Sequence, residues 1–354
     1  MTILITIILF VAILSILVLI HEFGHFIVAR FFGVHVEEFG IGFPPRAWGK
    51  KKGNTVYSLN WVPLGGFVKL KGEQGESHDS DSFASKKIWQ RVCILAAGVF
   101  MNLALTVGIF FVGFLVGMPQ ALDGSNVSGA YLRDEKIHVT QVLNRYPADK
   151  AGMKPGDALL SIDGQSFKKI SDIQQYMKEH AGKQIQVSFS RGSESLQTIL
   201  TPVYIQEGGS YGIGVGLAHT AIVSYPFVQA FFAAVNMTFV MALNILVTLG
   251  NAIRHLAFDG FVGPVGIAVY TATVTKLGFV YIFNLIAQLS LSLAIINFLP
   301  IPALDGGRVF FAVLEKIRGR AMAPLAENAI HLSGFVLLIA LLLLVTVRDV
   351  MNLF

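Results

Sequence analysis

Two histidines and a glutamate lie within five residues, His21-Glu22-Phe-Gly-His25, directly after residues 1–20, which carry no charged side chain. Residues four apart share one face of a helix, so the two histidines can bind one Zn²⁺ while Glu22, on the adjacent face, serves as a general base. The alternative is a chance cluster where a helix meets lipid headgroups. Ionisable groups at membrane depth are costly and mark functional sites, so the pattern predicts a catalytic zinc site.

A catalytic zinc commonly takes a third protein ligand, and Asp305 is the candidate. It follows the apolar stretch 277–304, in which two prolines interrupt the helix, and it precedes two glycines that permit close approach of the backbone. A carboxylate at a broken membrane helix usually lines a cavity. Taken alone, Asp305 is equally well explained as a helix cap or as the ion-pair partner of Arg308. Together with the histidine pair, it is predicted to be a metal ligand.

Long apolar stretches must position these residues. The chain of 354 residues is 54% hydrophobic and 14% charged, with a mean hydropathy of +0.63, which is too apolar for an ordinary soluble protein. Residues 1–20 span roughly 30 Å as a helix, one hydrocarbon thickness, and they lack the basic region and cleavage site of a signal peptide. Further spans are predicted at 92–118, 277–304 and 329–347. The net charge of +5 forms no nucleic-acid-binding patch, and the single cysteine cannot form an intramolecular disulfide.

Lysine and arginine residues orient these spans. Residues 30–91 hold ten of them and residues 305–328 hold four, whereas none lies between 119 and 132. Because positively charged loops stay in the cytoplasm, the N-terminus and 119–226 are predicted to lie outside, with 30–91 and 305–328 inside. The histidine pair and Asp305 then lie on the same, cytoplasmic side, as a shared metal site requires.

Two segments between the first two spans show strand patterns. Residues 55–60 and 66–71 are predicted to be short strands around a turn at 63–65. The second strand is apolar. Its unpaired edge, at Gly66, Phe67, Val68 and Lys69, can hold an unwound substrate by strand addition. The alternative is an ordinary surface hairpin.

Residues 119–226 differ in composition from the rest of the chain. Strand patterns at 137–144, 158–162, 184–190 and 196–204 enclose a short helix within 147–157 and a longer helix, capped by Ser171, that ends near His180. This order, with the phrase Pro147-Ala-Asp-Lys-Ala-Gly152, resembles a bacterial PDZ domain, which binds peptides by strand addition. The alternative is a spacer without a ligand. Since no long linker tethers it, the module is predicted mainly to exclude substrates with bulky external domains.

Residues 227–257 are apolar except for one line of polar side chains. Asn244, Thr248, Asn251 and His255 follow the spacing of one helical face. Such a helix either lies along the membrane or protein surface, or spans the membrane against partners, and its length and apolarity allow both. His255 has no second ligand one turn away and is interpreted as an interfacial histidine.

Taken together, the motifs resemble a known family. The His-Glu-x-x-His motif in the first span and the distal Asn297-x-x-Pro-x-Pro-x-Leu-Asp305-Gly-Gly motif are similar to those of site-2 proteases, which are intramembrane zinc metalloproteases. Three further stretches, at 65–70, 96–102 and 263–267, make the chain resemble the regulator-of-sigma-E protease branch (RseP type). The best-known members carry two tandem PDZ modules, whereas the interval 119–226 has room for one. The resemblance to this family also favours a helix at 227–257 that lies along the membrane or protein surface.

The resemblance implies a zinc endopeptidase of the bacterial cytoplasmic (inner) membrane, which cleaves within the bilayer. Its Zn²⁺ ligands would be His21, His25 and Asp305, with Glu22 as the base. Two amides in apolar segments, Asn102 and Asn297, would lie near the site. There they either hold the substrate backbone or oxyanion, or bond between helices.

The implied partners are the lipid bilayer and single-pass transmembrane substrates already trimmed outside, such as anti-sigma factors, together with remnant signal peptides. No nucleic acid is implied, and the oligomeric state is left open. Two rival functions are a PDZ scaffold with a vestigial metal site and a metal transporter. The intact motifs argue against the first, and the concentration of ionisable residues at two points argues against the second.

The expected fold class is a polytopic α-helical membrane protein with about four transmembrane helices, an inserted membrane-associated β-hairpin and one extracytoplasmic α+β PDZ-like domain. The membrane catalytic core is expected in two parts, 1–118 and 277–354. Between them lie the PDZ-like domain, 119–226, and an amphipathic membrane-associated helix with its connector, 227–276.

Overall fold

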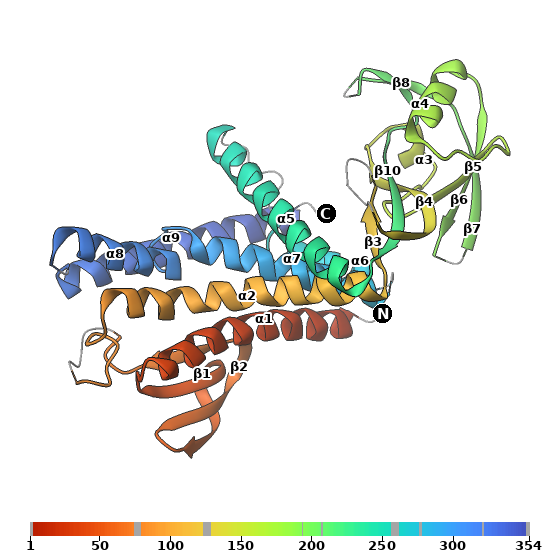
Figure 1. The fold of residues 1–354 in the computed structure, drawn as a ribbon. Helices are drawn as coiled ribbons and strands as arrows, with labels where there is room; N and C mark the ends of the chain where they lie inside the picture. Colours follow the sequence, from red (N-terminus) through yellow and green to blue (C-terminus); the bar gives the residue numbers. More distant parts are fainter. Residues whose placement is uncertain are drawn as a thin grey trace. The chain divides into compact units, whose positions relative to one another are not determined.

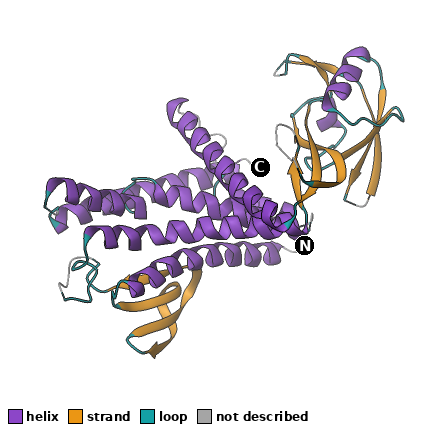
Figure 2. Cartoon of the chain, in the orientation of Figure 1, coloured by secondary structure: helices purple, strands orange, loops and turns teal. Residues whose placement is uncertain are grey.

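The computed structural model describes residues 3–73, 79–122, 129–192, 194–206, 208–255, 262–275, 278–320 and 322–351. Figure 1 shows the chain, and Figure 2 colours it by secondary structure. The chain divides into two compact units, one formed by Met1–Phe111 with Ala233–Phe354 and one formed by Val112–Phe232. The first unit is mainly helical and carries a small sheet, and the second is rich in strands.

Long apolar helices dominate the first unit. They are α1 (Ile3–Phe31), α2 (Ile88–Val116), α5 (Phe227–His255), α7 (Phe279–Phe298) and α9 (Pro324–Met351), joined by the shorter α6 (Pro264–Val274) and α8 (Asp305–Arg318). Within the described residues, five helices are long and apolar enough to cross a membrane. Four of them correspond to the predicted spans. The fifth is α5, for which the sequence allowed both a lying and a spanning arrangement.

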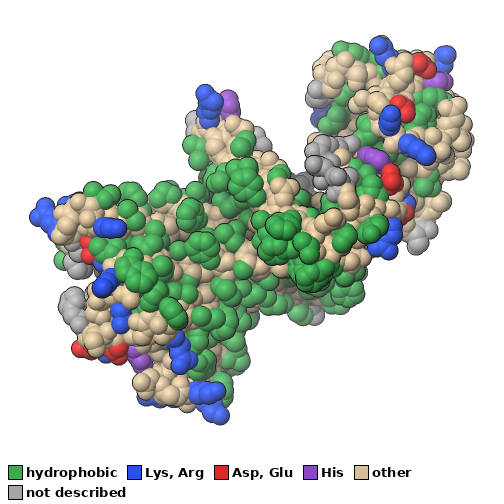
Figure 3. Space-filling view, viewed as in Figure 1, with side chains coloured by type: hydrophobic (Ala, Val, Ile, Leu, Met, Phe, Trp, Pro, Cys, Tyr) green, Lys and Arg blue, Asp and Glu red, His purple; other side chains and the backbone are tan. Residues whose placement is uncertain are grey.

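Hydrophobic side chains cover the outer faces of these helices. Figure 3 shows them along the middle of the helical unit, while charged side chains gather at the end where α8 and the small sheet lie. On α9, for example, Leu337, Leu343 and Leu344 are exposed. Apolar surface of this extent is unfavourable in water and suits the hydrocarbon of a bilayer.

Small and polar residues bring α1, α2 and α7 together. A Cβ on Gly24 of α1 would lie 2.5 Å from the Ala97 carbonyl oxygen of α2, so only glycine permits this approach. Thr106 of α2 donates a hydrogen bond to the Ala287 carbonyl of α7 (3.2 Å), and Ser290 of α7 donates to the Asn102 carbonyl of α2 (2.9 Å). Such contacts are typical of helix packing in membranes.

The small sheet consists of β1 (Val36–Lys52) and β2 (Thr55–Leu70). Residues 38–41 of β1 pair with two parts of β2, with 66–69 on one side and with 56–59 on the other. The partners of residues 38–41 rise from 56 to 59 but fall from 69 to 66, so the two parts of β2 run in opposite directions and the chain reverses between them, as the predicted turn at 63–65 requires. Next to this turn, Ser15 of α1 donates a hydrogen bond to the Pro63 carbonyl (2.9 Å).

The second unit is built around a six-stranded sheet of order β3-β10-β4-β5-β6-β7, with a separate β8-β9 hairpin. Two helices, α3 (Pro147–Lys150) and α4 (Ile170–Glu179), accompany it, and buried Ile162, Ile173 and Val187 belong to its core. The strands are β3 (Met118–Ala121), β4 (Tyr131–Val142), β5 (Ala158–Ile162), β6 (Ile185–Arg191), β7 (Glu194–Leu200), β8 (Val203–Ile205), β9 (Ser210–Gly212) and β10 (Val215–Ser224).

Two predictions for this unit are wrong in detail. The segment 196–204 is not one strand, since β7 ends before Pro202 and β8 begins after it. Ser171 does not cap α4, because Lys169 occupies the cap position and the Ser171 hydroxyl contacts Asp172 instead. Strand β10, which pairs with β3 and β4, has no counterpart among the predicted strands.

Candidate metal centre

The two histidines of α1 lie in the buried interior of the helical unit. His21 and His25 are 5% and 7% exposed, and their Nε2 atoms are 3.2 Å apart. The helical repeat places both side chains on the same face of α1. They therefore present two imidazole nitrogens to one point.

Asp305 brings a carboxylate to the same point from 284 residues away in the sequence. Its Oδ2 lies 2.8 Å from His21 Nε2 and 3.4 Å from His25 Nε2. Donor atoms that share a tetrahedral zinc ion at about 2.0–2.2 Å lie about 3.3 Å from each other, so the observed spacing fits zinc. Two imidazoles and one carboxylate also form a ligand set of catalytic zinc sites.

A glycine of α2 makes the space for this arrangement. A Cβ on Gly98 would lie 2.5 Å from His25 Nε2 and 2.6 Å from His21 Nε2. Any larger residue at this position would fill the point on which the three ligand atoms converge. Sequence reasoning quoted Gly98 only as part of the 96–102 stretch and gave it no role. A glycine inside an apolar helix was the available signal.

Backbone and side-chain bonds fix the imidazole rings. His25 Nδ1 lies 2.7 Å from the Ile94 carbonyl oxygen of α2, which can only accept, so Nδ1 carries the proton and Nε2 is free for metal. Asn102 Nδ2 lies 3.4 Å from His21 Nδ1. Rotation of the amide by half a turn would exchange its nitrogen and oxygen, and Oδ1 would then accept the His21 Nδ1 proton. This orientation also gives Oδ1 the partner that it otherwise lacks among the described residues.

Asn102 is fully buried. Substitutions can distinguish whether it orients the His21 ring or contacts the substrate. We expect Asn102→Leu to weaken zinc binding about tenfold and Asn102→Asp to retain it, because a carboxylate can still accept the His21 proton. Zinc affinity, measured by competition with a chelator, checks this. A raised KM for a substrate peptide with unchanged zinc affinity would instead support the predicted substrate contact.

The turn between α7 and α8 positions Asp305 near the histidines. Helix α7 ends at Phe298, and α8 begins at Asp305 itself, after a tight turn in which Ala303 adopts the left-handed region at φ 78°. That conformation costs a non-glycine residue on the order of 1–3 kcal/mol, so the surroundings must hold it. Gly306 and Gly307 lie against the carbonyls of Leu299 and Ile301, where a Cβ would be only 2.3 Å away.

The charges around Asp305 favour a ligand role over the alternatives. The carboxylate makes no side-chain cap to α8, whose N-cap position is Leu304. Arg308 forms its ion pair with Glu73, in the loop after β2. Asp305 is therefore neither the side-chain cap of α8 nor the partner of Arg308, and its carboxylate is directed at the histidines.

Glu22 lies beside the three candidate ligands, and its carboxylate faces β2. Its Oε2 accepts a hydrogen bond from the Val68 backbone N–H (3.1 Å). Along one edge, residues 66–69 pair with residues 41–38 of β1. Along the edge that faces Glu22, no strand pairs with them within the described residues. An open strand edge thus runs past the candidate base.

The other predicted substrate-binding residues fall in two places. Gly66 and Phe67 pack over Gly40 of β1, and Lys69 forms an exposed ion pair with Glu37 (2.9 Å). Asn297 lies half-buried in the last turn of α7, eight residues before Asp305.

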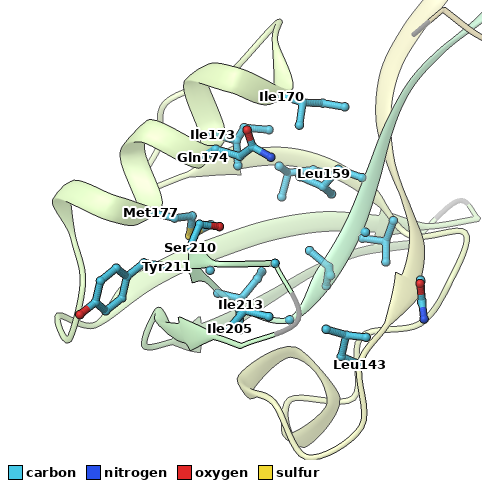
Figure 4. A pocket seen from close by; sticks show the side chains of 18 of the residues that line it. Leu143, Leu159, Ile170, Ile173, Gln174, Met177, Ile205, Ser210, Tyr211 and Ile213 are labelled. Atoms are coloured by element: carbon cyan, nitrogen blue, oxygen red, sulfur yellow. The ribbon is translucent and has the colours of Figure 1, made fainter. Parts of the chain in front are cut away.

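The second unit contains a groove of about 400 Å³ beside α4. Figure 4 shows Ile173 and Met177 of α4 facing Ile205, Ile213 and Leu143 across it. Strand β10 pairs with β4 along one edge, and along its other edge only residues 220–223 pair with β3. On that second edge, residues 215–218 have no strand partner among the described residues. A free edge next to an apolar groove can accept an extended peptide by strand addition.

Comparison with known proteins extends these observations over the whole chain. A family model described as Peptidase family M50 matches residues 9–341. A protein of Clostridium perfringens named as a zinc metalloprotease is 35% identical over 344 residues, which cover 95% of this chain and 96% of that protein. The regulator of sigma-W protease RasP of Bacillus subtilis is 28% identical over 432 residues, covering 99% of each chain.

A solved structure is also similar to part of this chain. A PDZ domain of an SdrC-like protein from Listeria monocytogenes is 24% identical and covers 25% of this chain and 92% of that chain, with a TM-score of 0.23.

Proposed function

Because this chain belongs to peptidase family M50, the site-2 protease family, we propose that it cleaves the transmembrane segments of single-pass membrane proteins. It is a zinc metalloprotease and a multi-pass membrane protein. One observation carries the proposal: His21, Glu22 and His25 lie within α1, a helix long and apolar enough to cross a membrane, and Asp305 follows seven residues after the end of α7, another such helix. A substrate segment that shares the bilayer can reach such a site.

The chain's own residues supply binding, positioning and proton transfer. His21, His25 and Asp305 would hold the Zn²⁺, which when bound polarises water and the substrate carbonyl. Glu22 takes a proton from the attacking water and passes it to the leaving amine nitrogen. Asn102 and the Ile94 carbonyl keep the two imidazole rings oriented, and Gly98 keeps the reaction point open.

The open edge of β2 suits an extended substrate. A transmembrane helix buries its own peptide bonds, so it must unwind before water can attack. Residues 66–69 offer backbone groups along an edge that passes Glu22, and a substrate strand added there would bring a peptide bond beside the base. The Val68 N–H, now bonded to Glu22, would then be shared with the substrate.

The substrate class follows by analogy with the relative that is named as a regulator of sigma-W protease. We infer anti-sigma-factor-like proteins trimmed outside, and remnant signal peptides. The test compares the membrane proteomes of cells that carry wild-type protein or Glu22→Gln. Trimmed single-pass proteins should accumulate only with the variant. No accumulation, together with no cleavage of purified model membrane peptides, would favour a scaffold role instead.

We further propose that the active site faces the cytoplasm of a bacterial inner membrane, since ten Lys and Arg residues lie in 30–91 and none in 119–132. In a variant with Cys93 replaced by alanine, a cysteine at Ser80 should react with an impermeant thiol reagent only after the membrane is opened. A cysteine at Ser166 should react without opening of that membrane. The reverse pattern would refute the orientation.

For the PDZ-like unit we propose size exclusion, with peptide binding secondary. Replacing residues 122–223 by a flexible linker should allow cleavage of an untrimmed substrate, because a bulky obstacle is gone. Gln174→Trp, at an exposed groove position of α4, should fill the groove and leave cleavage unchanged. Loss of cleavage of a trimmed substrate in both variants would instead indicate recruitment. Cleavage of purified trimmed and untrimmed substrates is the measurement.

A further inference from the structure

The left-handed turn before Asp305 is held from outside by α9. Ala303, at φ 78°, donates its backbone N–H to Nδ1 of His331 at 2.8 Å. The preceding residue, Pro302, has no N–H, so Ala303 provides the backbone donor in the middle of this turn. The bond therefore fixes the peptide that lies two residues before the candidate metal ligand.

A second residue of α9, Gly334, packs closely against the same turn. A Cβ on Gly334 would lie 2.5 Å from both the Cβ and the carbonyl oxygen of Pro302. His331 and Gly334 are three residues apart, so they share one face of α9. Together they contact two consecutive residues of the turn, Pro302 and Ala303.

The hydrogen bonding of His331 indicates that the ring is more than packing. To accept from Ala303, Nδ1 must be unprotonated, which leaves the proton on Nε2. Nε2 is buried and has no hydrogen-bond partner among the described residues. An unpaired buried donor is unfavourable, and the Phe311 ring contact at 5.3 Å could be made by any aromatic residue. A histidine here is best explained by its Nδ1 acceptor.

We propose that His331 is a positioning residue of the metal centre, which holds the 299–304 turn in the conformation that directs Asp305 at His21 and His25. No role was predicted for His331 from the sequence. The inference rests on the proposed function, since it assumes that Asp305 is the third ligand.

The test uses the full-length protein in detergent and measures zinc affinity by chelator competition, together with kcat and KM for a transmembrane peptide. His331→Phe keeps a ring against Phe311 but removes the acceptor, and it should weaken zinc binding about tenfold and lower kcat more than it raises KM. His331→Asn places an oxygen near the position of Nδ1 and should restore zinc affinity to within about threefold of wild type. Phe311→Leu is the matched control. It loses the ring contact but not the bond, so its thermal unfolding temperature should fall while its zinc affinity stays.

Gly334→Ala supplies a readout that does not depend on the fold tolerating His331→Phe. Alanine stabilises a helix relative to glycine, so α9 itself gains stability, yet the new Cβ must displace Pro302. Zinc affinity should fall without a lower unfolding temperature. Unchanged zinc affinity in folded His331→Phe, or equal weakening in His331→Phe and His331→Asn, would overturn the inference. If Asp305→Ala also leaves zinc affinity unchanged, the ligand assignment fails first; if only the His331 variants are silent, the ligand set stands and the positioning role fails.

Discussion

Glu22→Gln is expected to leave about one zinc per chain in place and to lower kcat by about 10²–10⁴, the range that a positioned general base contributes. Glutamine is nearly isosteric and can still accept the Val68 N–H through its carbonyl oxygen, so β2 keeps its contact with α1. It cannot take a proton from water at neutral pH. The three candidate ligand atoms belong to other residues, so metal content should be retained.

The measurement combines metal analysis of the purified protein with cleavage of a transmembrane peptide in detergent. Glu73→Gln is a suitable control, because it removes a carboxylate that is paired with Arg308 and is not the candidate base. Glu22→Gln activity close to that of wild type would eliminate Glu22 as the base. Loss of zinc in the same variant would indicate that Glu22 is a ligand.

Asp305→Ala is expected to lose both zinc and activity. Removing one of three protein ligands leaves the two histidines, which bind zinc far more weakly than a complete site. It also leaves the 2.8 Å contact at His21 Nε2 without its partner. Zinc affinity should fall by at least about a hundredfold, which exceeds the tenfold to hundredfold effect typical of residues that only orient a ligand.

Glu315→Gln provides the matched control for Asp305→Ala. Glu315 lies on the same helix, α8, and pairs with Arg91 of α2 at 2.7 Å, away from the candidate ligands. Its loss should affect the unfolding temperature but not zinc affinity. If Asp305→Ala abolishes cleavage at unchanged zinc affinity, Asp305 positions substrate or water and a different third ligand must be sought.

The parts of the fold that sequence predicted are those set by local pattern. Apolar length alone located the four expected spans, and the i, i+4 spacing placed His21 and His25 on one face. Asp305 could be singled out because prolines and glycines flank it, which is a local signal. Its actual approach to the histidines depends on the packing of α1 against α7 and α8, which local pattern does not encode.

The parts that sequence missed depend on contacts between distant segments. Gly98 matters because of where α2 crosses α1, and His331 matters because α9 lies against the turn before Asp305. Neither position has an informative neighbour in sequence. At 63–65 the local signal was correct, since proline and glycine indicate a turn and the two parts of β2 on either side run in opposite directions. Local pattern does not show that these two parts flank the same residues of β1.

The distance in sequence between the candidate ligands has a consequence for biosynthesis. His21 and Asp305 are 284 residues apart, so at roughly 5–20 residues per second the ribosome needs about 15–60 s to pass from one to the other. The turn before Asp305 is in turn braced by α9, the last long helix described. The nascent chain therefore inserts most of its length into the membrane before its metal site can close. A chain with the proposed activity is thus inactive until the helices that complete and brace its metal site have been synthesised.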